Sequence, residues 1–132
     1  MLTPKGGGMV RERFGFKRLV AYGLALDFYG WAVRVAGRLS GGELYLADQL
    51  RRAALSMVLN IAEGAGSWRP GNKRKHYATA RGSTFEAAAL LDALWRTGTI
   101  TREEFDEQES RLAETGARLT RLCQRYDTGR NA

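Results

Sequence analysis

The chain has 132 residues, 44% of them hydrophobic, which suits one domain with a packed core. Its single cysteine excludes an intrachain disulfide, and neither a signal-peptide run nor a window of about 18 apolar residues for a membrane span is present. We therefore expect a cytoplasmic protein. The net charge of +7 favours a polyanionic partner such as RNA or DNA, with ordinary solubility as the alternative explanation.

Residues 1–13 are predicted to form a flexible arm, and the first helix is predicted from Phe16 to Leu39. Apolar residues recur there at steps of three and four, namely Leu19, Tyr22, Leu26, Tyr29, Val33 and Ala36. Three glycines are spaced seven apart, which indicates either close approach of another backbone or drift at exposed positions: Gly23, Gly30 and Gly37. The wide aromatic coverage of this helix favours contact with a second subunit.

The second helix is predicted to begin with a capping box formed by Ser40 and Glu43, and to end in a left-handed stop at Gly64 and Gly66. The segment between is apolar nearly all round, so we expect burial on most sides. One polar line interrupts it, at steps of three and four: Gln49, Arg52, Ser56, Asn60 and Glu63.

A third helix is predicted from Asn72 to Arg96, antiparallel to the second because the link between them is short. It carries a matching polar line, consisting of His76, Thr79, Ser83 and Glu86. The predicted cross-helix contacts are Asn60 with His76 or Thr79, Ser56 with Thr79 or Ser83, and Arg52 with Glu86. We interpret this ladder as a structural network that fixes the register of the two helices. Catalysis by Glu63 or Glu86 with His76 is the alternative.

The fourth helix is predicted to begin at a capping box of Thr101 and Glu104 and to end before Asp127. Four residues seven apart face the core: Phe105, Leu112, Leu119 and Tyr126. Residues 128–132 are predicted to be a disordered tail. Four helices joined by short turns predict an all-α, up-down-up-down four-helix bundle over residues 14–127.

The second and third predicted helices also carry a family resemblance. QLRRAALSMVLNIAEGAGS followed by ARGSTFEAAALL resembles the small four-helix-bundle proteins encoded in intervening sequences of bacterial 23S ribosomal RNA genes. The matching residues are Gln49, Leu50, Arg51, Arg52, Ala53, Asn60, Ile61, Ala62, Glu63, Gly64, Gly66, Ala80, Gly82, Ser83 and Glu86. Ser67 departs from the pattern, which has a basic residue there.

The resemblance implies an all-α bundle, a homo-pentamer, a nucleic-acid role and no established enzyme activity. More distantly, the chain looks like the accessory variability proteins of diversity-generating retroelements. Those are basic pentameric bundles that partner a reverse transcriptase and nucleic acid. The resemblance therefore implies a homo-oligomer with RNA, DNA or a nucleic-acid-processing protein as partner.

Catalytic and cofactor motifs are absent from the sequence. One histidine and one cysteine do not make a metal site, and no P-loop or nucleophile elbow is present, so we predict no enzyme activity, no cofactor and no metal. Cys123 lies among apolar residues and is interpreted as core packing.

Basic residues gather in two segments, which we predict to bind nucleic acid. One is N-terminal, with Arg11, Arg13, Lys17 and Arg18, and the other begins the third helix, with Arg69, Lys73, Arg74 and Lys75. A Glu63–Lys73 contact across the turn would offset one of these charges. The favoured hypothesis is a non-enzymatic oligomeric bundle that binds nucleic acid or a nucleoprotein partner. A protein–protein scaffold is the alternative.

Overall fold

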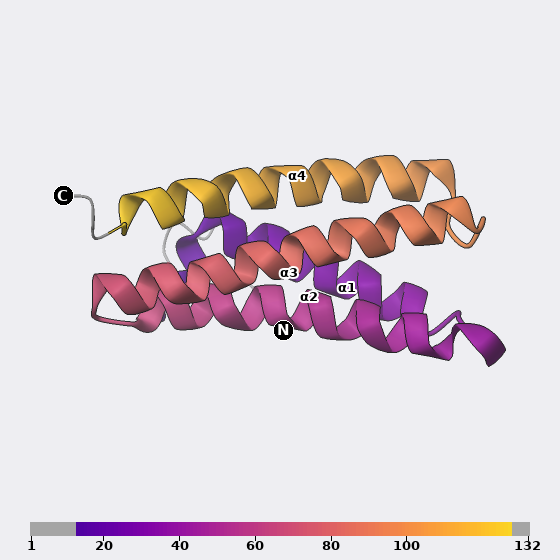
Figure 1. Cartoon of the computed structure of the whole chain (residues 1–132), viewed down its shortest axis with the longest axis horizontal. Helices are drawn as coiled ribbons and strands as arrows, with labels where there is room; N and C mark the ends of the chain where they lie inside the picture. Colours follow the sequence, from indigo (N-terminus) through magenta and orange to yellow (C-terminus); the bar gives the residue numbers. More distant parts are fainter. Residues whose placement is uncertain (1–12, 128–132) are drawn as a thin grey trace.

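The computed structural model describes residues 13–127, and within that range the regular structure is entirely helical (Figure 1). The elements are η2 (Gly15–Arg18), α1 (Val20–Ala36), η3 (Gly41–Glu43), α2 (Leu44–Gly66), α3 (Pro70–Arg96) and α4 (Arg102–Arg125). The predicted all-α class with four main helices is confirmed. The predictions for residues 1–12, Arg11 among them, and for 128–132 lie outside the described residues.

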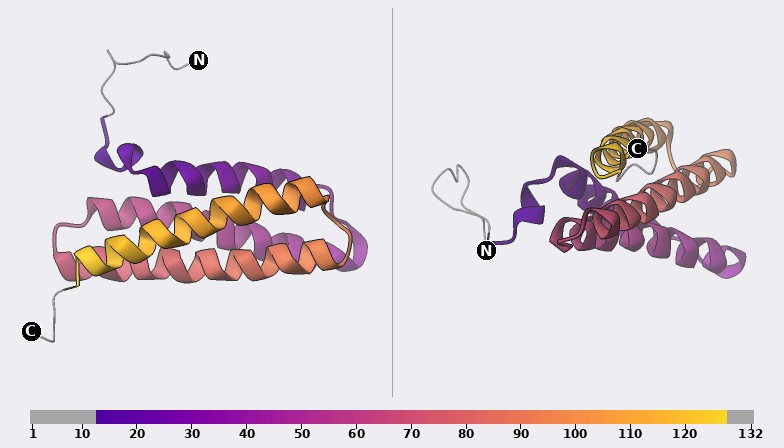
Figure 2. Two further views of the ribbon diagram at one scale, coloured as in Figure 1. Left: turned by 90° about the horizontal axis from the view of Figure 1, so that it is seen from above. Right: turned by 60° about the vertical axis from the view of Figure 1, so that its left-hand side comes forward.

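The four helices alternate in direction, and short turns connect them. α2 packs along α3 and α3 along α4, while α1 lies against both α2 and α4. Figure 2 shows α4 running obliquely across the bundle. One end therefore gathers the beginnings of α1 and α3 and the ends of α2 and α4. No helix within residues 13–127 has the length and apolarity needed to cross a bilayer.

The core follows the helical periodicity of the sequence. Its largest fully buried apolar side chains come from all four helices: Phe28, Val35, Leu50, Met57, Ile61, Leu91, Leu94 and Leu119. Full burial of one such side chain stabilises a fold by about 1.5–3 kcal/mol. The expected burial of α2 on most sides is wrong for the single chain, because Leu55 and Leu59 remain exposed on its outer face.

Several predicted helix ends are corrected. α1 begins at Val20, not at Phe16, because η2 occupies the preceding residues. The predicted Ser40 capping box does not form: Gly41 has φ of +60°, η3 occupies residues 41–43, and Ser40 makes no capping hydrogen bond. The Thr101 capping box is confirmed, with the Glu104 N–H donating to Thr101 Oγ1 at 3.0 Å and the Thr101 N–H donating to Glu104 Oε1 at 2.9 Å.

The predicted left-handed stop of α2 is wrong, since Gly64 and Gly66 are both helical and neither has a positive φ. Side chains satisfy the last carbonyls instead. Lys73 Nζ donates to the carbonyls of Gly64 at 3.2 Å and Ala65 at 2.9 Å, and Ser67 Oγ donates to the carbonyl of Glu63 at 2.8 Å. The side chain of Lys73 therefore closes the α2 end.

Gly82 in α3 is not closely packed against α2, because a Cβ at Gly82 would meet nothing within 4 Å. The same holds for Gly23 in α1, so no backbone between residues 13 and 127 approaches there from another helix. Gly64 is the glycine that packing requires. A Cβ built on it would lie 2.7 Å from Cε1 of Tyr77, whose ring is buried against α2.

Candidate functional site

The centre of the predicted polar ladder is confirmed. Ser56 Oγ and Ser83 Oγ lie 2.7 Å apart, which links α2 to α3. One turn along, Asn60 Oδ1 lies 3.2 Å from His76 Nδ1, and Asn60 Nδ2 donates to Ser56 Oγ at 3.2 Å. These groups satisfy one another between two apolar helices, so they fix the register of α2 against α3.

The ends of the ladder differ from the prediction. Arg52 pairs with Asp48 on its own helix at 2.9 Å and not with Glu86, and Arg52, Glu86 and Gln49 are all exposed. Thr79 Oγ1 donates to the carbonyl of Lys75 at 3.1 Å. Long charged side chains at exposed positions find partners one turn away, so helix spacing alone does not bring them together across the interface.

The three residues of the catalytic alternative, Glu63, Glu86 and His76, do not come together in one site. Glu63 Oε1 lies 3.3 Å from His76 Nδ1, but the Glu63 side chain is 59% exposed and Glu86 takes no part. None of these three residues lines any of the four hollows described. Over residues 13–127, no group of three histidine, cysteine or carboxylate side chains could hold a metal. Burial raises the pKa of the Cys123 thiol, which keeps it protonated.

Both predicted basic segments lie at the end of the bundle where α1 and α3 begin (Figure 1). We call this the basic end. α4 ends there too and adds a third group of basic residues, which was not among the predicted binding segments. The basic residues of this end are Arg13, Lys17, Arg18, Arg69, Lys73, Arg74, Lys75, Arg118, Arg121 and Arg125. The predicted up-down-up-down topology indicates that the arginines of α4 also lie at this end, because it places the last turn of α4 beside the first turn of α3.

Few of these cations are neutralised. The predicted Glu63–Lys73 contact is wrong, because Lys73 binds carbonyls of α2 and Glu63 lies against His76. Arg118 Nε lies 3.0 Å from Glu114 Oε2. Arg69, Arg74 and Lys75 are exposed and form no ion pair with any residue between 13 and 127. The structure therefore leaves uncompensated positive charge at the start of α3.

At the opposite end of the bundle, two arginines pair with carboxylates of α4. Arg38 Nη1 lies 3.1 Å from Glu104 Oε2, and the indole of Trp31 donates to the same oxygen at 3.2 Å. The hydrogen bond from Arg38 lowers the pKa of Glu104, against the smaller opposing effect of burial. Arg102 and Asp106 form an i,i+4 pair at 3.2 Å. α4 also begins at this end with four carboxylates, Glu103, Glu104, Asp106 and Glu107, which balance its unpaired arginines. The net positive charge of the chain is therefore concentrated at the basic end.

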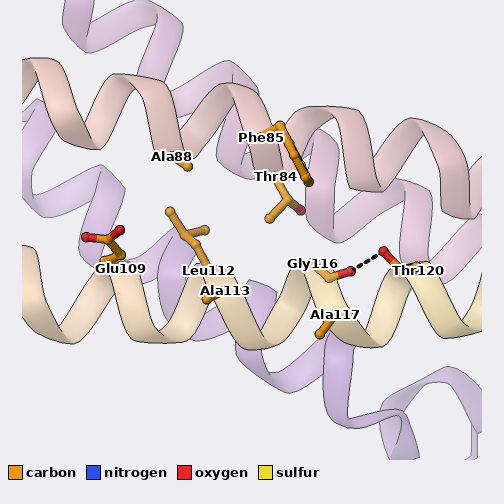
Figure 3. Close-up of a pocket in the computed structure, with 9 residues that line it drawn as sticks. All are labelled: Thr84, Phe85, Ala88, Glu109, Leu112, Ala113, Gly116, Ala117 and Thr120. Carbon is orange, nitrogen blue, oxygen red and sulfur yellow. Dashed lines mark hydrogen bonds between the residues drawn. The ribbon is translucent and has the colours of Figure 1, made fainter.

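An apolar groove runs between α3 and α4 (Figure 3). It encloses about 270 Å³ and is lined by Thr84, Phe85, Ala88, Glu109, Leu112, Ala113, Gly116, Ala117 and Thr120. Leu112 is buried at its floor, while Phe85 is 58% exposed at its wall. The guanidinium carbon of Arg81 lies 4.6 Å from the centroid of the Phe85 ring. No sequence pattern indicates this groove, because its lining comes from two helices and is made mostly of small residues.

Comparison with known proteins gives a family and a fold. A family model described as 23S rRNA-intervening sequence protein matches residues 17–121. The structure is similar to the crystal structure of a protein with unknown function from the S23 ribosomal protein family of Bacteroides thetaiotaomicron VPI-5482. The two are 21% identical with a TM-score of 0.72, over 80% of this chain and 96% of that chain. No curated protein matches the chain significantly.

Proposed function

The chain belongs to the family of 23S rRNA-intervening sequence proteins, and from that premise we propose that it is a non-enzymatic, homo-oligomeric bundle that binds RNA or DNA through its basic end. The observation that carries this proposal is the gathering of unpaired cations where α3 begins. Phosphate groups bind such a surface with release of counterions, so the interaction requires no base-specific motif.

The start of α3 is suited to phosphate for a second reason. The first N–H groups of a helix lack intrahelical partners, and the helix dipole adds partial positive charge there. Cations at this end typically cost about 0.3–1 kcal/mol each, which an anionic partner would offset. Arg69 is the N-cap and makes no side-chain capping bond, and no acidic residue lies in the first turn. The polyanion would therefore supply the charge that the chain lacks.

Changing Arg69, Arg74 and Lys75 together to glutamine should weaken binding to a generic single-stranded RNA. Loss of three phosphate contacts should lower the slope of log K against log salt by about 2. Helix stability should rise slightly, because three cations leave a helix N-terminus. Fluorescence anisotropy titrations at several salt concentrations, with circular dichroism as a check on folding, measure both effects.

A matched control removes the same charge at the other end of the bundle. Arg34, Arg51 and Arg96 are exposed and form no ion pair within residues 13–127. Their replacement by glutamine should leave most of the affinity. Equal losses in the two triple variants would mean that net charge alone drives binding. No RNA or DNA binding by the wild-type chain at any salt would favour the protein–protein scaffold instead.

We propose further that copies of this chain associate through their exposed apolar surfaces, with five subunits as the family resemblance implies. The α3–α4 groove is concave, while Leu55 and Leu59 of α2 and Leu26 and Val33 of α1 stand exposed on other faces. A concave site and convex apolar surfaces on different faces favour head-to-tail contacts, which form a closed ring when the rotation between neighbouring subunits completes a circle.

Replacing Ala117 by glutamate should dissociate this assembly, because a carboxylate would be buried without a partner in the filled groove. Light scattering should give a wild-type mass near five times 14.7 kDa and a smaller mass for the variant. Ala93→Glu, at an exposed position toward the far end of α3, is the control and should keep the wild-type mass. A wild-type monomer at micromolar concentration would contradict self-association, while a wild-type dimer would contradict only the number five.

A further inference from the structure

A second basic feature lies at the same end of the bundle, away from the start of α3. It is a hollow of about 340 Å³ between the start of α1 and the last turns of α4. Its lining consists of Arg18, Leu19, Val20, Ala21, Arg118, Arg121, Leu122 and Arg125. Half of these residues are arginines and none is acidic. The arginines come from segments about 100 residues apart, so only the folded chain creates this concentration of charge.

The arginines of the hollow differ in how they are held. Arg118 is half-buried and fixed by Glu114 at 3.0 Å. Arg18, Arg121 and Arg125 are exposed and form no ion pair with any described residue. The guanidinium of Arg125 also lies 6.0 Å from the centroid of the Tyr126 ring. Arg118 and Arg125 are thus partly held in place, while Arg18 and Arg121 can turn toward a ligand. Guanidinium groups present several N–H donors in one plane, which matches the oxygens of a phosphate group.

Ordinary helix stabilisation accounts for part of this cluster. Arg121 and Arg125 lie near the C-terminus of α4, where cations interact favourably with the helix dipole. Arg18 gains less from this effect, because it ends the four-residue η2 and lies just before the positive end of α1. That end has an apolar N-cap, Leu19, with no side-chain capping bond and no acidic residue in the first turn. The chain has therefore placed an uncompensated cation on the rim of a hollow that already contains three arginines.

We propose that this hollow is a phosphate-binding site, separate from the start of α3. The natural ligand would be the sugar–phosphate backbone of RNA or DNA, and this part of the inference rests on the proposed function. The hollow and the start of α3 are both at the basic end, so one polyanion could contact both. The same chemistry would also accept a free oligophosphate, and the test below separates the two sources.

The test compares the wild-type chain with a variant in which Arg18, Arg121 and Arg125 are all glutamine. Arg118 is kept because it pairs with Glu114. The Arg34, Arg51 and Arg96 glutamine variant again serves as the charge-matched control. Each protein is titrated with a generic single-stranded RNA by anisotropy and with inorganic tripolyphosphate by calorimetry. Circular dichroism and light scattering check that all three proteins remain folded and assembled.

The hollow variant should bind RNA about tenfold to 100-fold more weakly near 0.1 M salt, with a salt slope smaller by about 2, because three phosphate contacts are lost. It should also lose tripolyphosphate binding. If the wild-type chain binds tripolyphosphate but no RNA, and the variant binds neither, the phosphate site stands and the proposed nucleic-acid function fails. If the hollow variant binds both ligands as the control does, the phosphate site is overturned, whatever becomes of the function.

Discussion

Replacing Gly64 by alanine should lower the free energy of unfolding by about 1–3 kcal/mol, the usual cost of overpacking a core. The added Cβ would lie 2.7 Å from Cε1 and 2.9 Å from Cδ1 of Tyr77. Tyr77 is 2% exposed and its ring centroid lies 6.0 Å from that of Tyr126, so a shift of the ring would disturb this packing. Urea denaturation at one fixed protein concentration measures the change, since oligomer stability depends on concentration.

Gly82→Ala provides the matched control. Gly82 is an exposed glycine inside α3, and a Cβ there would meet nothing within 4 Å. Alanine at such a position should raise stability by about 0.5–1 kcal/mol, because it restricts the unfolded chain without a clash. Opposite signs at the two glycines are therefore expected. A neutral or stabilising effect of Gly64→Ala would contradict the close approach of Tyr77 to α2.

Replacing Glu104 by alanine should destabilise the fold by about 1–3 kcal/mol, because it leaves a buried indole donor unsatisfied and removes half of a capping box. Glu104 accepts from Trp31 at 3.2 Å and from the Thr101 N–H at 2.9 Å, and it pairs with Arg38 at 3.1 Å. Glu103→Ala is the control. Glu103 is exposed in the same turn and should lose only its interaction with the helix dipole, about 0.3–1 kcal/mol.

The pH dependence of stability provides an independent readout for Glu104. Its pKa in the folded chain is lowered, chiefly by the hydrogen bond from Arg38. The unfolded state therefore binds the proton more readily, and Glu104 contributes its full stabilisation above the ordinary glutamate range. That contribution should be lost as pH falls through the lowered pKa. In thermal melts, the melting temperature of the Glu104→Gln variant should fall less steeply with decreasing pH than that of the wild-type chain. If the melting temperature falls equally steeply in both proteins, other carboxylates cause the loss of stability at low pH.

The sequence predicts side-chain contacts between α2 and α3 correctly where helical spacing alone determines which residues face each other. Steps of three and four placed Ser56 opposite Ser83 and Asn60 opposite His76, and both contacts form. The same spacing failed for Arg52, because an exposed arginine reaches a carboxylate on its own helix more easily than one across the interface. Short polar side chains at half-buried positions therefore report register better than long charged ones.

Other features depended on the tertiary arrangement. The sequence predicts a helix stop at Gly64, but the role of Gly64 is set by Tyr77, a residue of the next helix. Arg38 and Trp31 meet Glu104 across 66 and 73 residues of sequence, which no local pattern specifies. The arginine-lined hollow likewise requires the start of α1 and the end of α4 to meet. Local rules predicted the helices and their pairing, while the sites arise where distant helix ends come together.

The salt dependence of RNA binding by the unmodified protein tests the central claim most directly. The claim is that unpaired cations at the basic end bind the phosphate backbone. Dissociation constants for a generic single-stranded RNA, measured between about 50 and 200 mM salt, should rise along a straight line in log–log form, with a slope of about 0.7 per phosphate contact. Affinity that does not change with salt, or no binding even at the lowest salt, would contradict the account.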